Sequence, residues 1–576
     1  MQTYERRYSM TATVIVFLTR YILAFLAVWV VIRCFRSMLS DKYEPEIWGY
    51  LLYPGGSSAP LTHWESLIGR ARTADIVVSS PDVSRIHAVL MRNDKGIWKV
   101  FDIASKKGVF VNRERVTILG TQVRHGDRIQ IGSTKLTFVE ANESDLQYID
   151  ERRTSAGTAI SPVGTLLLLS LFQAFLMLQY SYTAPDEYVV LTVLTFFAVM
   201  MLQWLCYLFM RTMGRRGFEV ETLAFFLSTL GFSIVATSAP ADLDKTLILL
   251  IAGVILYYVM GWWLRDLRRV KLMRWPATLA ALGLLVVNLL IADPTYGAKN
   301  WIEIGGITVQ PSEFVKVLYI YAGAASLERL FTKRNLILFI GFSAACVMAL
   351  ALMGDYGAAV IFFVTFLVIS FMRSGSLATV FLAIGGAGMA GFLVFTIKPY
   401  IAQRFATWGN VWADPFGAGY QQTRTLSAAA SGGLFGHGAG NGWLESIVFS
   451  NTDMVFGIVC EELGLIVALL AVLSIIGLAF FAVRSAAHGR STYYVIAACS
   501  ASALMIIQMS LNVFGSLDIL PFTGVTFPFI SKGGTSLIAC WMMLSFVKAA
   551  DTRKDASFVV KRAKVKADKK NWGDMI

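Results

Sequence analysis

The sequence predicts a polytopic α-helical membrane protein, with about thirteen transmembrane helices, that carries a cytoplasmic all-β domain near its N-terminus. Composition is the first observation: of 576 residues, 56% are hydrophobic and 15% are charged, against about 25% charged in ordinary soluble domains. The second is the recurrence of apolar runs from residue 160 nearly to the end. The third is a stretch of alternating polar and apolar residues near the start. A single water-soluble globule is excluded.

Charge and cysteine usage narrow the class further. The net charge of +13 would suit a nucleic-acid partner, but the basic residues cluster beside apolar segments, as between residues 265 and 274. This pattern is typical of cytoplasmic anchoring of membrane spans, so we expect no nucleic-acid partner. The six cysteines lie in or beside apolar runs, and an extracellular disulfide framework is excluded.

Residues 1–46 are expected to form an N-terminal transmembrane anchor. The run 12–32 is almost entirely apolar and reaches the ~20 residues that cross a bilayer. A cleaved signal peptide is the alternative. No small-residue cleavage site follows, however, and Arg33, Arg36 and Lys42 resemble the flank of a stop-transfer anchor.

Residues 47–140 are predicted to form the soluble β domain. Short alternating runs, such as residues 98–102 and 128–131, are separated by turn signals such as residues 93–96. The linker 141–158 is rich in Asp, Glu and Arg and returns the chain to the membrane.

Twelve further apolar segments are long enough, or nearly so, to cross a bilayer. Two lie in residues 159–216, ten lie in residues 217–549, and a basic tail of residues 550–576 follows. The segments are 160–180, 187–210, 219–239, 246–263, 276–292, 311–327, 335–353, 356–372, 377–397, 453–483, 492–514 and 534–549.

Basic clusters fall on alternate connections between these segments. The positive-inside rule then places the β domain and the C-terminus in the cytoplasm of a bacterial plasma membrane. The same rule places three connections outside: residues 292–310, 398–451 and 515–533. The basic stretch 548–570 is interpreted as a face attracted to anionic membrane lipids, in preference to a specific partner site.

The β domain contains four spaced motifs: Gly69-Arg70, Ser84-Arg85-Ile86-His87, residues 102–112 and residues 125–132. Their order resembles a forkhead-associated (FHA) domain. The resemblance implies a β-sandwich whose loops bind a phosphothreonine-containing protein. It assigns Arg70 and Ser84 to the phosphate and Arg85 to the same site. An arginine fork and a hydroxyl are good partners for phosphate oxygens.

One position departs from the FHA pattern. Lys107-Gly108-Val109 stands where the family usually has Asn-Gly-Thr. Lys107 would therefore add charge attraction to the phosphate, or else the site has lost selectivity. His87 is expected to be a buried structural group of its turn. A docking platform that no longer binds phosphate is the alternative for the whole module.

Four other stretches are rich in Gly, Pro and polar residues at places where lipid-exposed loops are not tolerated. They are residues 297–316, 354–357, 414–464 and 521–536. Together they closely resemble the SEDS (shape, elongation, division and sporulation) family, which includes FtsW, RodA and SpoVE. The resemblance spans about residues 217–549, so the three spans before it are additions to a ten-helix core.

The SEDS resemblance implies a peptidoglycan glycosyltransferase that polymerises lipid II on the outer face of the cytoplasmic membrane. It also implies a partner, a class B penicillin-binding protein with transpeptidase activity. The reaction needs a base for the attacking hydroxyl and cations for the departing pyrophosphate. A lipid II flippase and a non-catalytic scaffold are the alternatives. The role in division, elongation or sporulation stays open.

Asp414 is assigned as the catalytic base because it matches the family's Asp before Pro-Phe-Gly. From spacing alone, the competing interpretation is that Asp414 caps the following turn, since Asp-Pro is a turn former. The resemblance reverses that preference.

The remaining substrate-binding candidates are polar or aromatic residues of the same four stretches and of the long outer loop. Cations lead this set, although Asn300 stands where the family usually has Arg and weakens one phosphate contact. The candidates are Lys299, Trp301, Gln310, Glu313, Lys316, Asp355, Arg404, Gln421, Arg424, Ser531 and Lys532.

Glu313 and Lys316 are three apart on an expected helix and so share a face. A structural ion pair and a substrate contact are equally compatible with that spacing. Near Asp355, the familiar Gln-Pro-Asp-Leu-Gly form keeps only its Asp and final Gly357. No cofactor is certain: a histidine metal site is not expected because only five His are present. A divalent cation, Mg²⁺ or Mn²⁺, would still suit a pyrophosphate.

Overall fold

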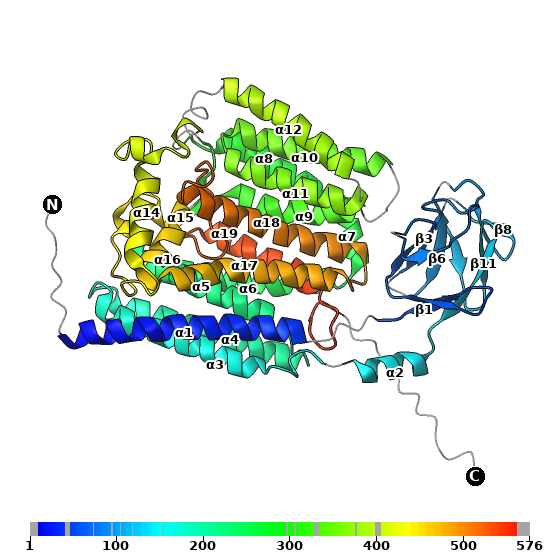
Figure 1. The fold of residues 1–576 in the computed structure, drawn as a ribbon, viewed down its shortest axis with the longest axis horizontal. Coiled ribbons are helices and arrows are strands. Elements are labelled where there is room, and N and C mark those ends of the chain that lie inside the picture. Colours follow the sequence, from blue (N-terminus) through cyan, green and yellow to red (C-terminus); the bar gives the residue numbers. More distant parts are fainter. Residues whose placement is uncertain are drawn as a thin grey trace, which may run out of the picture.

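The protein consists of a long bundle of helices with a β-sandwich at one end (Figure 1). The computed structural model describes residues 10–40, 46–72, 74–93, 96–103, 105–117, 119–153, 155–294, 298–304, 307–327, 333–374, 377–397 and 405–560. The predicted fold class, a polytopic helical protein with an all-β domain, is confirmed.

The β domain is built from two antiparallel-dominated sheets packed face to face. One sheet has the order β2-β1-β11-β10-β7-β8 and the other β4-β3-β5-β6-β9. Alternation drives the packing: in β6, Trp98 and Val100 are buried and Lys99 is exposed. Trp98 meets Phe138 from the opposite sheet, with ring centroids 5.3 Å apart. The strands are β1 Gly49–Leu52, β2 Ser58–Leu61, β3 Glu65–Gly69, β4 Ile76–Val77, β5 Ala88–Arg92, β6 Trp98–Asp102, β7 Val109–Val111, β8 Glu114–Arg115, β9 Thr121–Val123, β10 Arg128–Ile131 and β11 Thr134–Glu140.

Helices account for nearly all of the remaining described chain. They are α1 Met10–Ser40, α2 Glu143–Arg152, α3 Pro162–Thr183, α4 Val189–Thr212, α5 Glu219–Ser238, α6 Leu243–Leu264, α7 Leu267–Leu272, α8 Arg274–Ile291, α9 Pro311–Leu327, α10 Lys333–Leu352, α11 Tyr356–Ser374, α12 Leu377–Ile397, α14 Tyr420–Gly432, α15 Ser450–Asp453, α16 Val455–Leu463, α17 Leu465–Ala486, α18 Thr492–Ser516 and α19 Gly534–Ala549. Within the described ranges, nine helices are long and apolar enough to cross a membrane, and three shorter apolar helices accompany them. The protein is a multi-pass membrane protein.

Every predicted apolar segment coincides with a helix, with one correction. The segment predicted as a single crossing at 453–483 is divided into α16 and α17 at Gly464. Gly464 has φ +90°, and a Cβ there would lie 2.3 Å from the Leu434 carbonyl oxygen, so the helix breaks where a loop crosses it. The structure also adds features that the sequence reading lacked, namely α2 in the linker and a hairpin of β12 (Ile302–Ile304) and β13 (Ile307–Val309).

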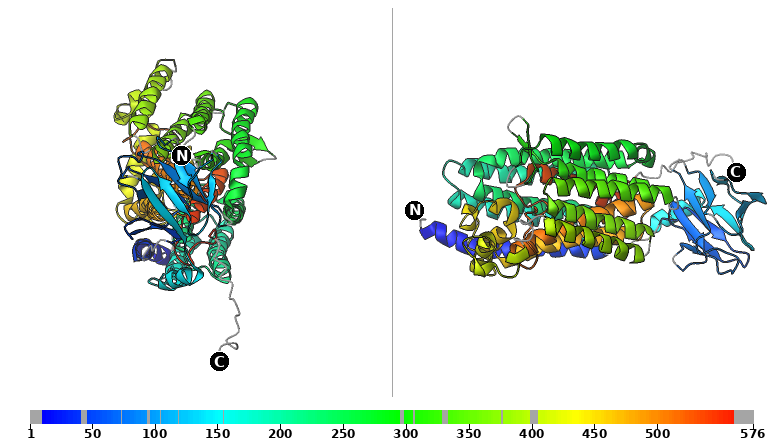
Figure 2. Two further views of the ribbon diagram at one scale, coloured as in Figure 1. Left: turned by 90° about the vertical axis from the view of Figure 1, so that its right-hand side faces the viewer. Right: turned by 90° about the horizontal axis from the view of Figure 1, so that it is seen from above.

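Three helices that precede α5, namely α1, α3 and α4, form one side of the bundle. α1 packs on α3, α17 and α5, and α3 packs on α4 and α5, as Figures 1 and 2 show from different sides. The β-sandwich lies at one end of the bundle, and the region of α14, α15 and α16 lies toward the other. We call these the sandwich end and the loop end.

The first part of the predicted basic tail is packed rather than free. Arg553 is 5% exposed and pairs with Glu219 on α5 at 3.2 Å and with Asp551. Lys548, at the end of α19, is fully buried and lies 3.1 Å from Glu221. These two basic residues are therefore partners of buried carboxylates. The predicted lipid-facing stretch beyond residue 560 lies outside the described residues.

Candidate functional site

Asp414 lies in an exposed turn at the loop end, between the 3-10 helix η2 (Val411–Ala413) and α14. Its two carboxylate oxygens accept hydrogen bonds from different backbone donors: Oδ1 from Gly417 N–H and Oδ2 from Ala418 N–H, both at 2.9 Å. The turn-capping geometry expected from Asp-Pro is therefore present. Because each carboxylate oxygen has two acceptor positions, the exposed Asp414 can accept a further hydrogen bond, for example from a hydroxyl group whose proton it then takes.

Arg424 and Gln421 stand on the first turns of α14, next to Asp414 in the chain. The Arg424 guanidinium lies over the rings of Phe416 and Tyr420, at 5.5 and 5.2 Å from their centroids. Gln421 Nε2 donates to the Val448 carbonyl at 3.0 Å. A carboxylate and a half-exposed cation thus lie near the same end of α14.

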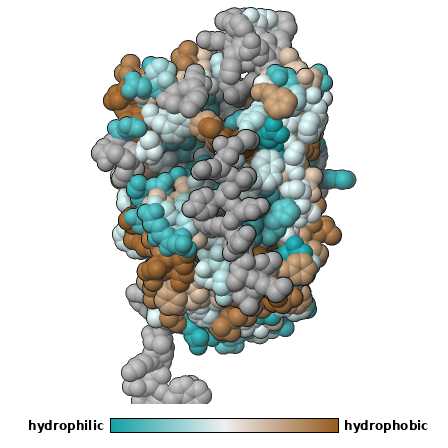
Figure 3. All heavy atoms as spheres, turned by 90° about the vertical axis from the view of Figure 1, so that its left-hand side faces the viewer, coloured by the Kyte–Doolittle hydropathy of each residue, from teal (hydrophilic) through white to brown (hydrophobic). Residues whose placement is uncertain are grey.

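Aromatic residues surround this turn, and the chain before it is fixed to another loop. Trp408 Nε1 donates to the Ile519 carbonyl at 3.1 Å, and Gly409 N–H donates to Asp518 at 3.0 Å. Trp412 and Phe416 are 61% and 82% exposed. Seen toward the loop end, hydrophobic side chains lie at several places around the rim of the molecule, and hydrophilic ones lie both at the rim and further in (Figure 3).

Lys299 has a local role at the end of α8. Its Nζ donates to the Leu289 carbonyl at 3.2 Å, and its backbone N–H donates to the Met353 carbonyl at 2.8 Å. Trp301 begins the hairpin side of this connection and is 40% exposed. Gln310 precedes α9 and accepts the Glu313 N–H at 3.2 Å. In this arrangement the Lys299 ammonium satisfies a helix C-terminus.

Glu313 and Lys316 form the ion pair that their spacing predicts. Lys316 Nζ lies 2.7 Å from Glu313 Oε1, and both side chains are 3% exposed. Lys316 also donates to Gln508 on α18 at 3.2 Å, and Gln508 donates to Thr526 at 2.7 Å. The pair thus joins α9 to α18 inside the bundle.

Asp355 caps α11 by accepting the Ala358 N–H at 2.8 Å.

Ser531 and Lys532 bind other parts of the chain. Ser531 Oγ donates to the Thr452 carbonyl at 2.6 Å. Lys532 Nζ lies 2.7 Å from Asp242, and its backbone N–H donates to the Asn451 carbonyl at 2.8 Å. The fourth predicted stretch is therefore folded onto the segment that precedes α16.

Two residues of this network were not predicted from the sequence. Asn512 on α18 is 1% exposed and donates to the carbonyls of Asp453 and Val525 at 3.1 and 2.7 Å. Asp242 at the start of α6 supplies the partner of Lys532. A polar side chain within an apolar segment was the available signal for Asn512, whereas nothing in the sequence pairs Asp242 with a lysine 290 positions later.

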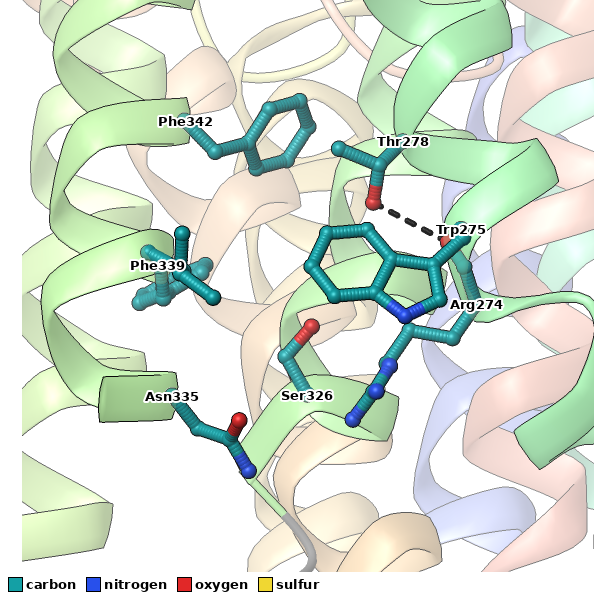
Figure 4. A pocket seen from close by; sticks show the side chains of 8 residues that line it. Arg274, Trp275, Thr278, Ser326, Asn335, Phe339 and Phe342 are labelled. Atoms are coloured by element: carbon teal, nitrogen blue, oxygen red, sulfur yellow. Dashed lines mark hydrogen bonds between the residues drawn. The ribbon is translucent and has the colours of Figure 1, made fainter. Parts of the chain in front are cut away.

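Arg404, a predicted substrate-binding cation, lies outside the described residues. Among the residues that are described, no three His, Cys, Asp or Glu are grouped as metal ligands. A small pocket lies at the beginning of α8, the end of that helix that is away from the loop end. It contains none of the predicted site residues (Figure 4). It is lined by Arg274, Trp275, Thr278, Ser326, Asn335, Leu338, Phe339 and Phe342.

The predicted phosphopeptide residues lie on neighbouring loops of the β-sandwich. Arg70 and Arg85 are exposed and Ser84 is half-buried. Arg70 N–H donates to the Ser84 carbonyl at 3.0 Å, which holds the two predicted phosphate contacts together. Lys107, 56% exposed, forms an ion pair with Asp82 at 2.9 Å. Asp82 therefore occupies the charge of Lys107 that was expected to attract a phosphate.

His87 has the structural role that the sequence predicts. It is fully buried, its Nδ1 accepts the Ser84 N–H at 3.0 Å, and its Nε2 lies 3.2 Å from the Gly108 carbonyl. With Nδ1 as acceptor, Nε2 carries the proton and donates to Gly108. The ring therefore connects the Ser84 and Lys107 loops.

The β-sandwich contacts the bundle at the connection between α17 and α18. Glu65 of β3 accepts the Thr492 N–H at the start of α18, at 3.3 Å. Glu46 binds both Arg490 (2.6 Å) and Arg153 (3.0 Å). Burial raises the pKa of Glu46, but the two guanidinium groups lower it more, so the pKa lies below its ordinary value of 4.5. Glu46 is therefore ionised when the two parts are joined.

Comparisons with known proteins agree with the two-part architecture. Residues 66–132 match the model of the FHA domain, and residues 221–556 match the model of the FtsW/RodA/SpoVE cell cycle proteins. The second match covers more than half of the chain.

This chain belongs to the FtsW/RodA/SpoVE family.

Its relatives in that family cover its helical part. A probable peptidoglycan glycosyltransferase FtsW of Buchnera aphidicola is 33% identical over 281 residues, which are 46% of this chain and 70% of the relative. The peptidoglycan glycosyltransferase RodA of Mycobacterium tuberculosis is 29% identical over 52% of this chain and 67% of its own length. One chain of a solved peptidoglycan synthase complex has the same fold, with a TM-score of 0.50, 24% identity, and coverage of 57% of this chain and 96% of that one.

Proposed function

We propose that this protein polymerises lipid II into peptidoglycan glycan strands at the outer face of the cytoplasmic membrane. The observation that carries the proposal is the exposed Asp414 carboxylate in a preformed turn at the loop end, with the Arg424 cation on the adjoining helix. Family membership and the names of the relatives support the same reaction. The helices that lead from this turn to the sandwich end are long enough to separate the two across a bilayer.

Asp414 takes the proton of the acceptor sugar hydroxyl as that oxygen attacks the anomeric carbon of the donor. The bond from this carbon to the undecaprenyl pyrophosphate breaks, and the leaving group departs with the electron pair. The two backbone donors hold the carboxylate in one orientation, which general base catalysis requires. Arg424 supplies positive charge for the departing pyrophosphate. Of the other predicted contacts, Trp301 and Gln421 lie at accessible positions.

The β-sandwich regulates this activity from the cytoplasm by binding a phosphothreonine-containing protein through Arg70 and Ser84. The contact of Glu65 with the first turn of α18 offers a route for the signal, because α18 also carries Gln508 and Asn512. A class B penicillin-binding protein is the expected partner on the outer side. The neighbouring solved chain comes from a peptidoglycan synthase complex, which supports an assembly of this kind.

The test is an assay of purified protein with labelled lipid II. We expect Asp414→Asn to abolish strand formation, because an amide keeps the size of the side chain but is a negligible base. Asp293→Asn is the matched control, since Asp293 is an exposed carboxylate on another loop-end connection. Full activity of Asp414→Asn would refute the mechanism. If the wild-type protein translocates lipid II without forming strands, it is a flippase. If it neither translocates lipid II nor forms strands, it is a scaffold.

A further inference from the structure

The loop that follows α14, residues 433–446, is held on one side by carboxylates of α16. Glu461 accepts the N–H groups of Trp443 and Leu444 at 2.9 and 3.1 Å. Glu462 accepts the Gly440 N–H at 3.0 Å. Both carboxylates are at most 2% exposed. On this side the loop is therefore held by the part of the chain that matches the family model.

On its other side the loop contacts α1 and α3, which lie outside residues 221–556. Gln179 on α3 is fully buried, and its Oε1 accepts the Ala439 N–H at 2.8 Å. Its Nε2 donates to Thr19 Oγ1 on α1 at 2.8 Å, which fixes the orientation of the amide. Arg20 Nη1 donates to the Gly436 carbonyl at 3.1 Å. Two helices thus bind two backbone groups of the loop.

The approach of α1 to the loop is close. A Cβ on Gly438, whose φ is +100°, would lie 2.3 Å from Val16 Cγ1. The rings of Tyr21 and Phe435 are 4.8 Å apart. The loop is therefore packed against α1, and its contact with these helices is not confined to single hydrogen bonds.

This loop is directly continuous with the catalytic turn. It begins where α14 ends, and α14 begins six residues after Asp414. α14 packs along α16, and its first turn is attached to Val448 through Gln421. A shift of residues 433–446 would move the C-terminal end of α14, and the Asp414 turn is attached to the other end of the same short helix.

We propose that Gln179 and Arg20 are positioning residues, through which α1 and α3 complete the active site by fixing the loop that follows α14, the helix that begins next to the Asp414 turn. The two helices then serve the transferase itself, in addition to joining the β-sandwich to the membrane. This inference rests on the proposed glycosyltransferase function.

The experiment compares Gln179→Leu with Gln173→Leu in the full-length protein. Gln173 is the same residue type on the same helix and is 1% exposed, but it binds Gln203 and Thr229 between helices and does not touch the loop. We expect Gln179→Leu to speed hydrogen–deuterium exchange in peptides from residues 433–446. We also expect it to slow lipid II polymerisation about tenfold at saturating substrate, with KM little changed. Gln173→Leu should leave both values within about twofold of the wild type.

Thr19→Val provides a second variant in case Gln179→Leu does not fold, because it removes only the hydroxyl that orients Gln179. It should shift exchange and rate in the same direction by a smaller amount. Wild-type exchange and wild-type rate in the folded variants would overturn the inference, as would an equal loss in Gln173→Leu. If wild-type protein forms no strands, the proposed function fails, and the exchange comparison still decides whether Gln179 holds the loop.

Discussion

Replacement of Gly417 by alanine tests whether the Asp414 turn must be preformed. The Cβ of an alanine at this position would lie 2.2 Å from Asp414 Oδ2 and 2.8 Å from Oδ1. Ordinary contacts begin at 3.4 Å, so the carboxylate must move by more than about 1 Å, a displacement of the size that costs catalytic geometry. The same movement breaks the hydrogen bonds that the N–H groups of Gly417 and Ala418 donate to this carboxylate.

The cost of this change falls on activity rather than on folding. Two backbone bonds to a carboxylate contribute about 1.5–3 kcal/mol each where they are protected from water, and less in this exposed turn. The fold does not depend on them, because Asp414 lies at the surface. A catalytic group misplaced by about 1 Å loses about 100-fold in rate. We therefore expect Gly417→Ala to retain its thermal unfolding temperature and to lose about two orders of magnitude in polymerisation rate.

The measurement is the initial rate of strand formation from labelled lipid II in detergent or proteoliposomes. Gly283→Ala is the matched control, because a Cβ at Gly283 on α8 meets no atom within 4 Å. Its rate should equal that of the wild type. A wild-type rate for Gly417→Ala would refute the reasoning, since the carboxylate would then tolerate displacement from its two donors.

Two further predictions concern the β-sandwich. Arg70→Ala should lower affinity for a phosphothreonine peptide about tenfold or more in calorimetry, while Arg72→Ala, also exposed, should not; equal binding of the unphosphorylated peptide would argue against phosphate recognition. The second prediction concerns pH. Arg490 and Arg153 lower the pKa of Glu46 below 4.5. The ionised Glu46 therefore holds the β-sandwich on the bundle fully above pH 4.5, and this contribution is lost as the pH falls through the lowered pKa. Limited proteolysis of the full-length protein should accelerate only below pH 4.5. Glu46→Gln should release the sandwich at neutral pH, because it weakens the contact between sandwich and bundle by about 2 kcal/mol. Unchanged proteolysis in both experiments would contradict this account.

The sequence predicted the elements well because their signals are local. A run of about 20 apolar residues has one stable solution in a bilayer, and strict alternation in residues 98–102 is typical of a half-buried strand. The Glu313–Lys316 pair was predictable for the same reason, since both partners lie within one helical turn. The division at Gly464 was not, because it depends on a loop from another segment crossing the helix.

Site residues were identified by type, but their partners were not. Lys299 was expected to meet phosphate and Lys532 to bind substrate, and the structure places their ammonium groups on the Leu289 carbonyl and on Asp242. Asp414 was expected to be either a base or a turn cap, and the geometry of the turn allows one carboxylate to do both.

By itself, the sequence determined the membrane class, the β domain and the order of the motifs, because apolar length, alternation and motif spacing act over neighbouring residues. Only the tertiary structure decided that Gln179 reaches Ala439, that Glu65 reaches α18 and that Lys532 reaches Asp242. These contacts join residues that are hundreds of positions apart, and they depend on how helices pack, which no local pattern encodes.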